Sequence, residues 1–149
     1  MVRVHWATRA RRSLSNRDVA RAVEAALAHG GRPGAEIAVV FVDDPTLAEL
    51  HERVLSDPTP TDVITFDLGE EGGGPVGELY VSPERARAVA RRRGGSVERE
   101  LSLYVVHGVL HLCGYDDEKP RDRSRMRAAE RAVLERLGFP PERNGPGRD

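Results

Sequence analysis

The stretch "VERELSLYVVHGVLHLCGYDD" (97–117) decides the fold of this chain. Its apolar residues fall on nearly every side of a helix rather than on one stripe, and such a helix lies in the middle of a hydrophobic core. We expect the helix to run over roughly residues 97–113 and to end at Gly114, because glycine readily takes the left-handed conformation that closes a helix. The other helices and the strands should therefore pack around this segment.

Two histidines, His107 and His111, lie four residues apart on this helix. Residues at this spacing share one face and lie about 6 Å apart along the axis, so both imidazoles can reach one metal ion, as in many zinc hydrolases. A left-handed turn at Gly114 reverses the chain, which lets Asp117 swing back toward them as a third ligand. Asp116 competes for this role, and the spacing favours Asp117.

A His-x-x-x-His pair also arises by chance, and core histidines usually form hydrogen bonds only. Two features favour a metal site here: imidazoles without strong partners are costly in an apolar helix, and a glycine and an acid follow at the spacing of a third ligand. Gly108 stands where zinc proteases of the His-Glu-x-x-His kind carry their general base, which argues against such a peptidase. Cys113, about 200° around the helix from His111, is interpreted as a small buried residue.

Strand and helix signals alternate along the rest of the chain. Apolar runs predict strands over residues 2–6, 35–42, 62–68 and 77–82. Capping residues and glycines delimit four further helices: from Ser15 or Asn16 to Gly30, over 43–55 with Asp44 as the cap, from Ser82 to Gly94, and from about Asp122 to Leu137.

The acidic, glycine-rich segment 69–77 reads as a hairpin connection, so the strands on either side of it should be antiparallel. The remaining strands alternate with helices. We therefore predict an α+β fold with a central mixed β-sheet of about four strands, packed with helices, in a single domain over residues 1–137. The tail "GFPPERNGPGRD" (138–149) is expected to be disordered.

Composition excludes several classes of protein. The formal net charge is −1, so the chain is not a polycation, although arginines cluster at 9–12, 85–93 and 121–127 and guanidinium groups suit phosphate. No stretch of about eighteen apolar residues predicts a membrane helix, and the basic start lacks the apolar segment of a secretory signal. The single cysteine cannot form an internal disulfide and fits the cytoplasm.

The segment "HGVLHLCGYDD" (107–117), together with "VDDPTLAEL" (42–50), "TPTDVITF" (59–66) and "GELYVS" (77–82), resembles the YbeY family of bacterial metal-dependent endoribonucleases. The match runs in order over about residues 35–137. The resemblance implies a zincin-like domain with a buried metal-bearing helix, one Zn²⁺ ion and single-strand-specific cleavage of RNA. It also implies a cytoplasmic role in 3′-end maturation of 16S rRNA and in ribosome quality control, with the ribosome as partner and no DNA substrate.

Two positions depart from that family. Its first two histidine ligands map onto His107 and His111, but Asp117 stands where the family usually has a third histidine. A carboxylate lowers the positive charge of the site, so a bound water should be less acidic, and other divalent metals can suit the ligand set. The arginine that many members carry before the Pro-Thr-Asp segment aligns with Leu55, with Arg53 nearby.

The sequence leaves several questions about catalysis open. Glu78, at the start of a strand, is the one candidate general base, although an exposed charge on an edge strand is the simpler interpretation. Either a water or the ribose 2′-hydroxyl could attack phosphorus. The alternative function is a non-catalytic ribosome-assembly factor with a structural metal; an iron oxygenase or a small-phosphoester hydrolase also fits this ligand set. The oligomeric state is not predicted.

Overall fold

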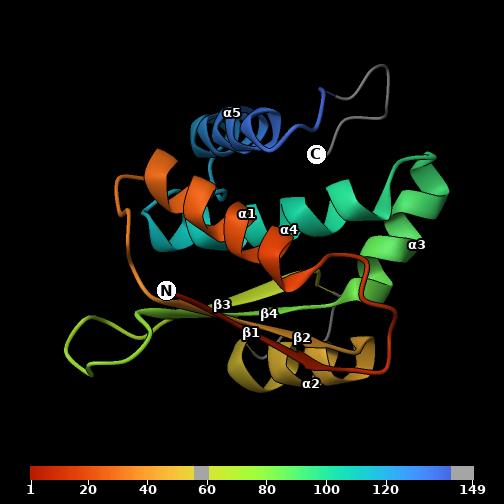
Figure 1. Ribbon diagram of the computed structural model, residues 1–149, viewed down its shortest axis with the longest axis horizontal. Helices are drawn as coiled ribbons and strands as arrows, with labels where there is room; N and C mark the ends of the chain where they lie inside the picture. Colours follow the sequence, from red (N-terminus) through yellow and green to blue (C-terminus); the bar gives the residue numbers. More distant parts are fainter. Residues whose placement is uncertain (56–60, 142–149) are drawn as a thin grey trace.

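The computed structural model describes residues 1–55 and 61–141, and within these ranges four strands form one sheet in the order β1-β2-β4-β3 (Figure 1). The strands are β1 (Val2–Ala7), β2 (Ile37–Val42), β3 (Val63–Asp67) and β4 (Gly77–Val81). β1, β2 and β4 are parallel, whereas β3 runs antiparallel to β4 as the hairpin segment predicts. The predicted α+β class with a mixed sheet is confirmed.

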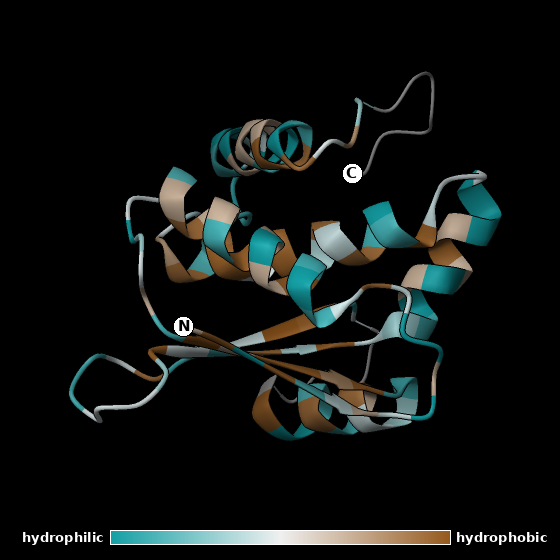
Figure 2. Ribbon diagram, in the orientation of Figure 1, coloured by the Kyte–Doolittle hydropathy of each residue, from teal (hydrophilic) through white to brown (hydrophobic). Residues whose placement is uncertain are grey.

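The helices cover the two faces of the sheet unequally. α2 (Asp44–Leu55) lies on one face, while α1 (Asn16–His29) and α4 (Val97–Leu112) lie on the other, with α5 (Pro120–Arg136) above them and α3 (Pro83–Arg93) at one end (Figure 1). Hydrophobic residues follow the strands and the inner sides of the helices, and hydrophilic residues mark the outer sides of α1, α3 and α5 (Figure 2).

α4 is the central helix that the sequence predicts. Its side chains Leu101, Val105, Val106, Val109 and Leu110 have no exposed surface. The helix approaches the sheet closely at Gly108, where an added Cβ would lie 2.6 Å from Leu79 Cδ2. Hydrophobic burial on all sides therefore holds in place the element that carries both histidines.

The cap of α2 differs from the prediction. Asp43, not Asp44, caps this helix, because the Thr46 amide donates to Asp43 Oδ1 over 2.9 Å. Asp44 is the first residue of the helix; its amide donates to Glu84 Oε1, and its carboxylate accepts a hydrogen bond from Ser82. The Asp44 carboxylate, which the sequence predicts as the cap of α2, therefore binds to the start of α3 instead.

One cluster of core residues draws members from β1, α1, β2, β4, α3, α4 and α5, which supports our proposal that residues 1–137 form a single domain; a smaller cluster under α2 contains Val42, Leu47 and Ile64. Phe139, in the segment expected to be disordered, packs against this core, and the rest of that expectation, for residues 142–149, lies outside the described residues. Within the described ranges no helix combines the length and apolar character needed to cross a membrane.

Candidate metal centre

The structure brings together the three side chains that the spacing selects. His107 and His111 lie near the end of α4, and Asp117 follows in the turn after it. Asp117 Oδ2 is 3.4 Å from His107 Nε2 and 3.5 Å from His111 Nε2. One ligand atom from each residue can be chosen so that all three lie within 4.8 Å of one another.

The turn at Gly114 explains why Asp117 reaches the histidines. Gly114 has φ of +99°, and the Tyr115 amide donates to the Leu110 carbonyl over 3.0 Å, which is the hydrogen bond of a Schellman motif. This motif reverses the chain at the end of α4. Asp116 is used differently, since its Oδ1 accepts the Asp117 amide over 2.8 Å. Of the two adjacent acids, Asp117 is therefore the one that faces the imidazoles.

The donor set fits one divalent ion. Zinc bound tetrahedrally at about 2.0–2.1 Å separates its ligand atoms by about 3.3 Å, close to the two distances measured at Asp117. The side chains of His107, His111 and Asp117 are 14%, 30% and 42% exposed, so exposure increases from the helix toward the turn. Among the described residues no fourth ligand joins this group. Three protein ligands leave a coordination position open, as in catalytic zinc sites.

A cleft of about 550 Å³ extends from these ligands along β3, one of the two edge strands of the sheet. The Thr65 hydroxyl donates to the Gly108 carbonyl over 3.5 Å and joins this strand to α4. Among the described residues that line the cleft there is no arginine or lysine, so its wall offers acceptors rather than cations. The lining residues are His51, Val54, Thr61, Asp62, Val63, Ile64, Thr65, Asp67, His107, His111, Leu112 and Asp117.

A fourth polar residue, Glu130 of α5, contacts this site, although no local motif in the sequence predicts it there. His107 Nδ1 lies 2.5 Å from Glu130 Oε2, and Glu130 is only 3% exposed. The signal was present in the sequence: Glu130 falls on the apolar stripe of α5 between Met126 and Val133, where a carboxylate needs a partner.

Glu78 does not lie in the site. Its neighbours on β4, Gly77 and Leu79, face α4, so alternation along the strand turns Glu78 to the opposite face of the sheet. There its carboxylate accepts the Tyr80 hydroxyl over 3.3 Å, and burial, followed by this carboxylate, raises the pKa of Tyr80. β4 lies between β2 and β3, so the interpretation as an edge-strand charge was also wrong.

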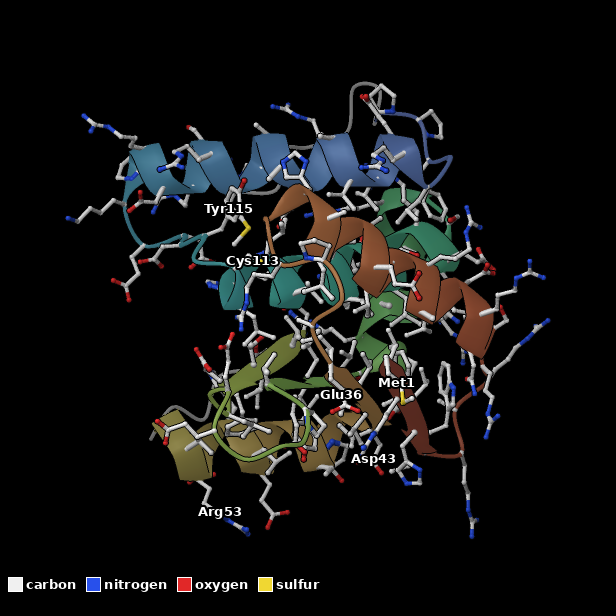
Figure 3. All side chains as sticks on the ribbon, turned by 60° about the vertical axis from the view of Figure 1, so that its left-hand side comes forward. Met1, Glu36, Asp43, Arg53, Cys113 and Tyr115 are labelled. Atoms are coloured by element: carbon white, nitrogen blue, oxygen red, sulfur yellow. The ribbon has the colours of Figure 1, made fainter. Side chains whose placement is uncertain are left out.

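Cys113 is half-buried, not fully buried as the sequence predicts, whereas Gly108 is tightly packed. Cys113 packs against Gly30 on another side of α4, and burial raises the pKa of its thiol (Figure 3). Gly108 faces Leu79 in the sheet, so the helix has no room there for the glutamate of a His-Glu-x-x-His protease. Arg53 points outward and pairs with Glu49 over 2.7 Å (Figure 3). The side chain at position 55 lies outside the described part of the structure.

Comparisons with known proteins agree on one family. The family described as Endoribonuclease YbeY matches residues 6–138. Curated proteins named Endoribonuclease YbeY include one from Beutenbergia cavernae, 39% identical over 68% of this chain and 74% of that protein. Another, from Nocardia farcinica, is 41% identical over 69% of this chain and 62% of that protein. A third, from Chlorobium luteolum, is 38% identical over 91% of this chain and 97% of that protein.

A solved structure has the same fold. The solution structure of TM1509 from Thermotoga maritima superimposes with a TM-score of 0.63 at 28% sequence identity. The similarity covers 92% of this chain and 89% of that one. The chain thus spans nearly the whole of some relatives and a little under two thirds of others, such as the protein from Nocardia farcinica.

Proposed function

Since the chain belongs to the endoribonuclease YbeY family, we propose that it cleaves single-stranded RNA at a divalent metal ion held by His107, His111 and Asp117. It is a metal-dependent endoribonuclease of rRNA maturation, a hydrolase that acts on RNA phosphodiester bonds. The observation that carries the assignment of the site is the position of Asp117 Oδ2, which is 3.4 and 3.5 Å from the two imidazole Nε2 atoms.

The finer parts of the proposal concern the metal and the partners. We assign one Zn²⁺ ion, because two imidazoles and a carboxylate suit it, while the carboxylate also admits other divalent metals. We assign the 3′ end of 16S rRNA as substrate, the ribosome as partner and the cytoplasm as the compartment. The single cysteine and the absence of a membrane-spanning helix within the described residues are compatible with this compartment.

His107, His111 and Asp117 would hold a divalent ion, which would supply Lewis acidity toward a phosphate oxygen and toward an attacking hydroxyl or water. The chain's own residues provide the binding surface. Thr65, Asp62 and Asp67 line the cleft along β3 and offer acceptors to the N–H edges of unpaired bases. The negative charge of Asp62 and Asp67 disfavours binding of RNA phosphates at the wall, so the phosphates are left to bind at the metal. Edge readout of this kind requires bases that are free of a duplex, which supports single-strand specificity.

Arginines outside the cleft can bind phosphates of the RNA segments that extend beyond the cleft. α5 begins three residues after Asp117, and its first turns carry Arg121, Arg123 and Arg125. Guanidinium groups pair with phosphate in bidentate geometry, and contacts of this kind are weakened by salt.

The test uses the full chain in two measurements. Elemental analysis should find about one equivalent of zinc in the wild-type protein and almost none in H107A, and only the wild type should cleave single-stranded RNA that carries the 16S 3′ end. A duplex of the same sequence should stay intact. H5A, at an exposed position of β1, is the matched control and should behave as the wild type. Full cleavage by metal-free wild-type protein would exclude the proposed chemistry.

The alternative of a non-catalytic assembly factor is not favoured. A structural zinc ion is usually enclosed by four protein ligands, and the described residues supply three that open onto a cleft.

A further inference from the structure

We propose that Glu130 is a positioning residue for the metal: its buried carboxylate fixes the tautomer and the ring orientation of His107. This inference rests on the proposed function only in so far as His107 binds a metal ion. Glu130 lies 23 residues further along the chain, on α5, and reaches across the contact between α4 and α5 to the imidazole.

The two nitrogens of His107 face different groups. Nδ1 is 2.5 Å from Glu130 Oε2, whereas Nε2 is 3.4 Å from Asp117 Oδ2 on the ligand side. An ionised carboxylate only accepts hydrogen bonds, so the imidazole proton resides on Nδ1 and donates to Glu130. Nε2 then keeps its lone pair for the metal. Without Glu130 the proton of the neutral imidazole could reside on either nitrogen, and the ring could rotate between orientations.

Burial makes this contact hard to replace by water. Glu130 is 3% exposed and lies among the apolar side chains of α5, where Met126 is 2% and Val133 0% exposed. A carboxylate in such surroundings is stable only with strong partners. A divalent ion held through Nε2 would add positive charge to the His107 side of this contact.

The two histidines differ in this respect. The described residues place no carboxylate against Nδ1 of His111, and Nε2 of this histidine lies 3.5 Å from Asp117 Oδ2. The His111 side chain is also more exposed, at 30% against 14% for His107. His107 is thus the oriented ligand of the pair, and His111 the more adaptable one.

A purely structural role for Glu130, in which it only holds α5 against α4, makes a different prediction. In that case loss of the carboxylate would lower the stability of the metal-free protein and leave the metal affinity of the folded protein unchanged. The positioning role predicts a loss of affinity measured on folded protein. Residues that orient metal-bound histidines typically contribute about 10–100-fold in metal affinity.

The experiment compares E130Q, E130M and the control E135Q, whose glutamate is exposed on the same helix. Zn²⁺ dissociation constants are measured by competition with a chelator, and the visible spectrum of bound Co²⁺ reports on the ligand set. Circular dichroism of the metal-free proteins sets a temperature at which each is folded. We expect Zn²⁺ binding to weaken about 10–100-fold in E130Q and E130M and less than twofold in E135Q.

If E130M does not fold, E130Q decides the question by itself. Zn²⁺ affinity within twofold of the wild type in the folded Glu130 variants would overturn the positioning role, whether or not RNA cleavage is affected. Wild-type protein that binds Zn²⁺ but does not cleave RNA would refute the proposed function and leave this inference standing. Wild-type protein that binds no Zn²⁺ would refute both.

Discussion

Replacement of Gly108 by alanine tests the close packing that positions the metal-bearing helix. The added Cβ would lie 2.6 Å from Leu79 Cδ2 and 3.1 Å from Thr65 Oγ1, and Leu79 has no exposed surface into which it could retreat. Carbon atoms pack best at about 3.5–4.0 Å, so α4 would have to move away from the sheet by about 1 Å. Overpacking of this kind costs about 1–3 kcal/mol.

The helix itself gains from the same substitution. Alanine is more favourable than glycine inside a helix by about 1 kcal/mol, which offsets part of the cost. The net range is about 0–2 kcal/mol, so we expect G108A to lower the free energy of unfolding by about 1 kcal/mol, which corresponds to a fall in Tm of about 2–4 °C for a domain of this size.

Thermal and urea unfolding of the metal-free proteins, followed by circular dichroism, measure the effect without a contribution from metal binding. G95A is the matched control: Gly95 has free space around the added Cβ and precedes α4, so its Tm should be unchanged or slightly raised. A Tm of G108A equal to or above that of the wild type would show that the helix and the sheet are not packed as closely as described.

Four further measurements test other parts of the structure. D117N should weaken Zn²⁺ binding by more than tenfold, measured by chelator competition, because an amide replaces a charged ligand, whereas D117H should retain binding. D43A should lower the free energy of unfolding by about 1 kcal/mol at pH 7, measured by urea titration. The Thr46 hydrogen bonds hold the pKa of Asp43 below its ordinary 3.8. The difference between D43A and the wild type should therefore shrink below about pH 4, because this stabilisation is lost as pH falls through the folded-state pKa. Cys113 should react with iodoacetamide at pH 8 about tenfold more slowly than a free thiol by mass spectrometry, because burial raises its pKa and restricts access. RNA affinity, measured by filter binding, should fall steeply between 50 and 200 mM salt. The slope of log affinity against log salt concentration should be about proportional to the number of phosphates contacted.

Local patterns predicted the elements of this fold and the three candidate ligands. His107, His111 and Asp117 lie within eleven consecutive residues, on one helix and the turn that ends it. The spacing of a helix and the left-handed conformation of Gly114 determine their relative positions almost without reference to the rest of the chain.

The cap of α2 shows where local patterns stop being sufficient. Both Asp43 and Asp44 are good capping residues, and the sequence favoured the second. The structure selects Asp43, because Asp44 instead contacts Ser82 and Glu84, which come from a distant part of the chain.

The sequence by itself thus determined the elements, the central position of α4 and the triad, since each depends on interactions between near neighbours in the chain. Only the tertiary structure decided that Glu130 lies against His107 and that Glu78 lies on the face of the sheet opposite α4. It also decided that β4 lies between β2 and β3. Alternation shows that a residue is on one face of a strand or helix, but which element covers that face depends on how distant segments pack, and burial of the whole core decides that packing.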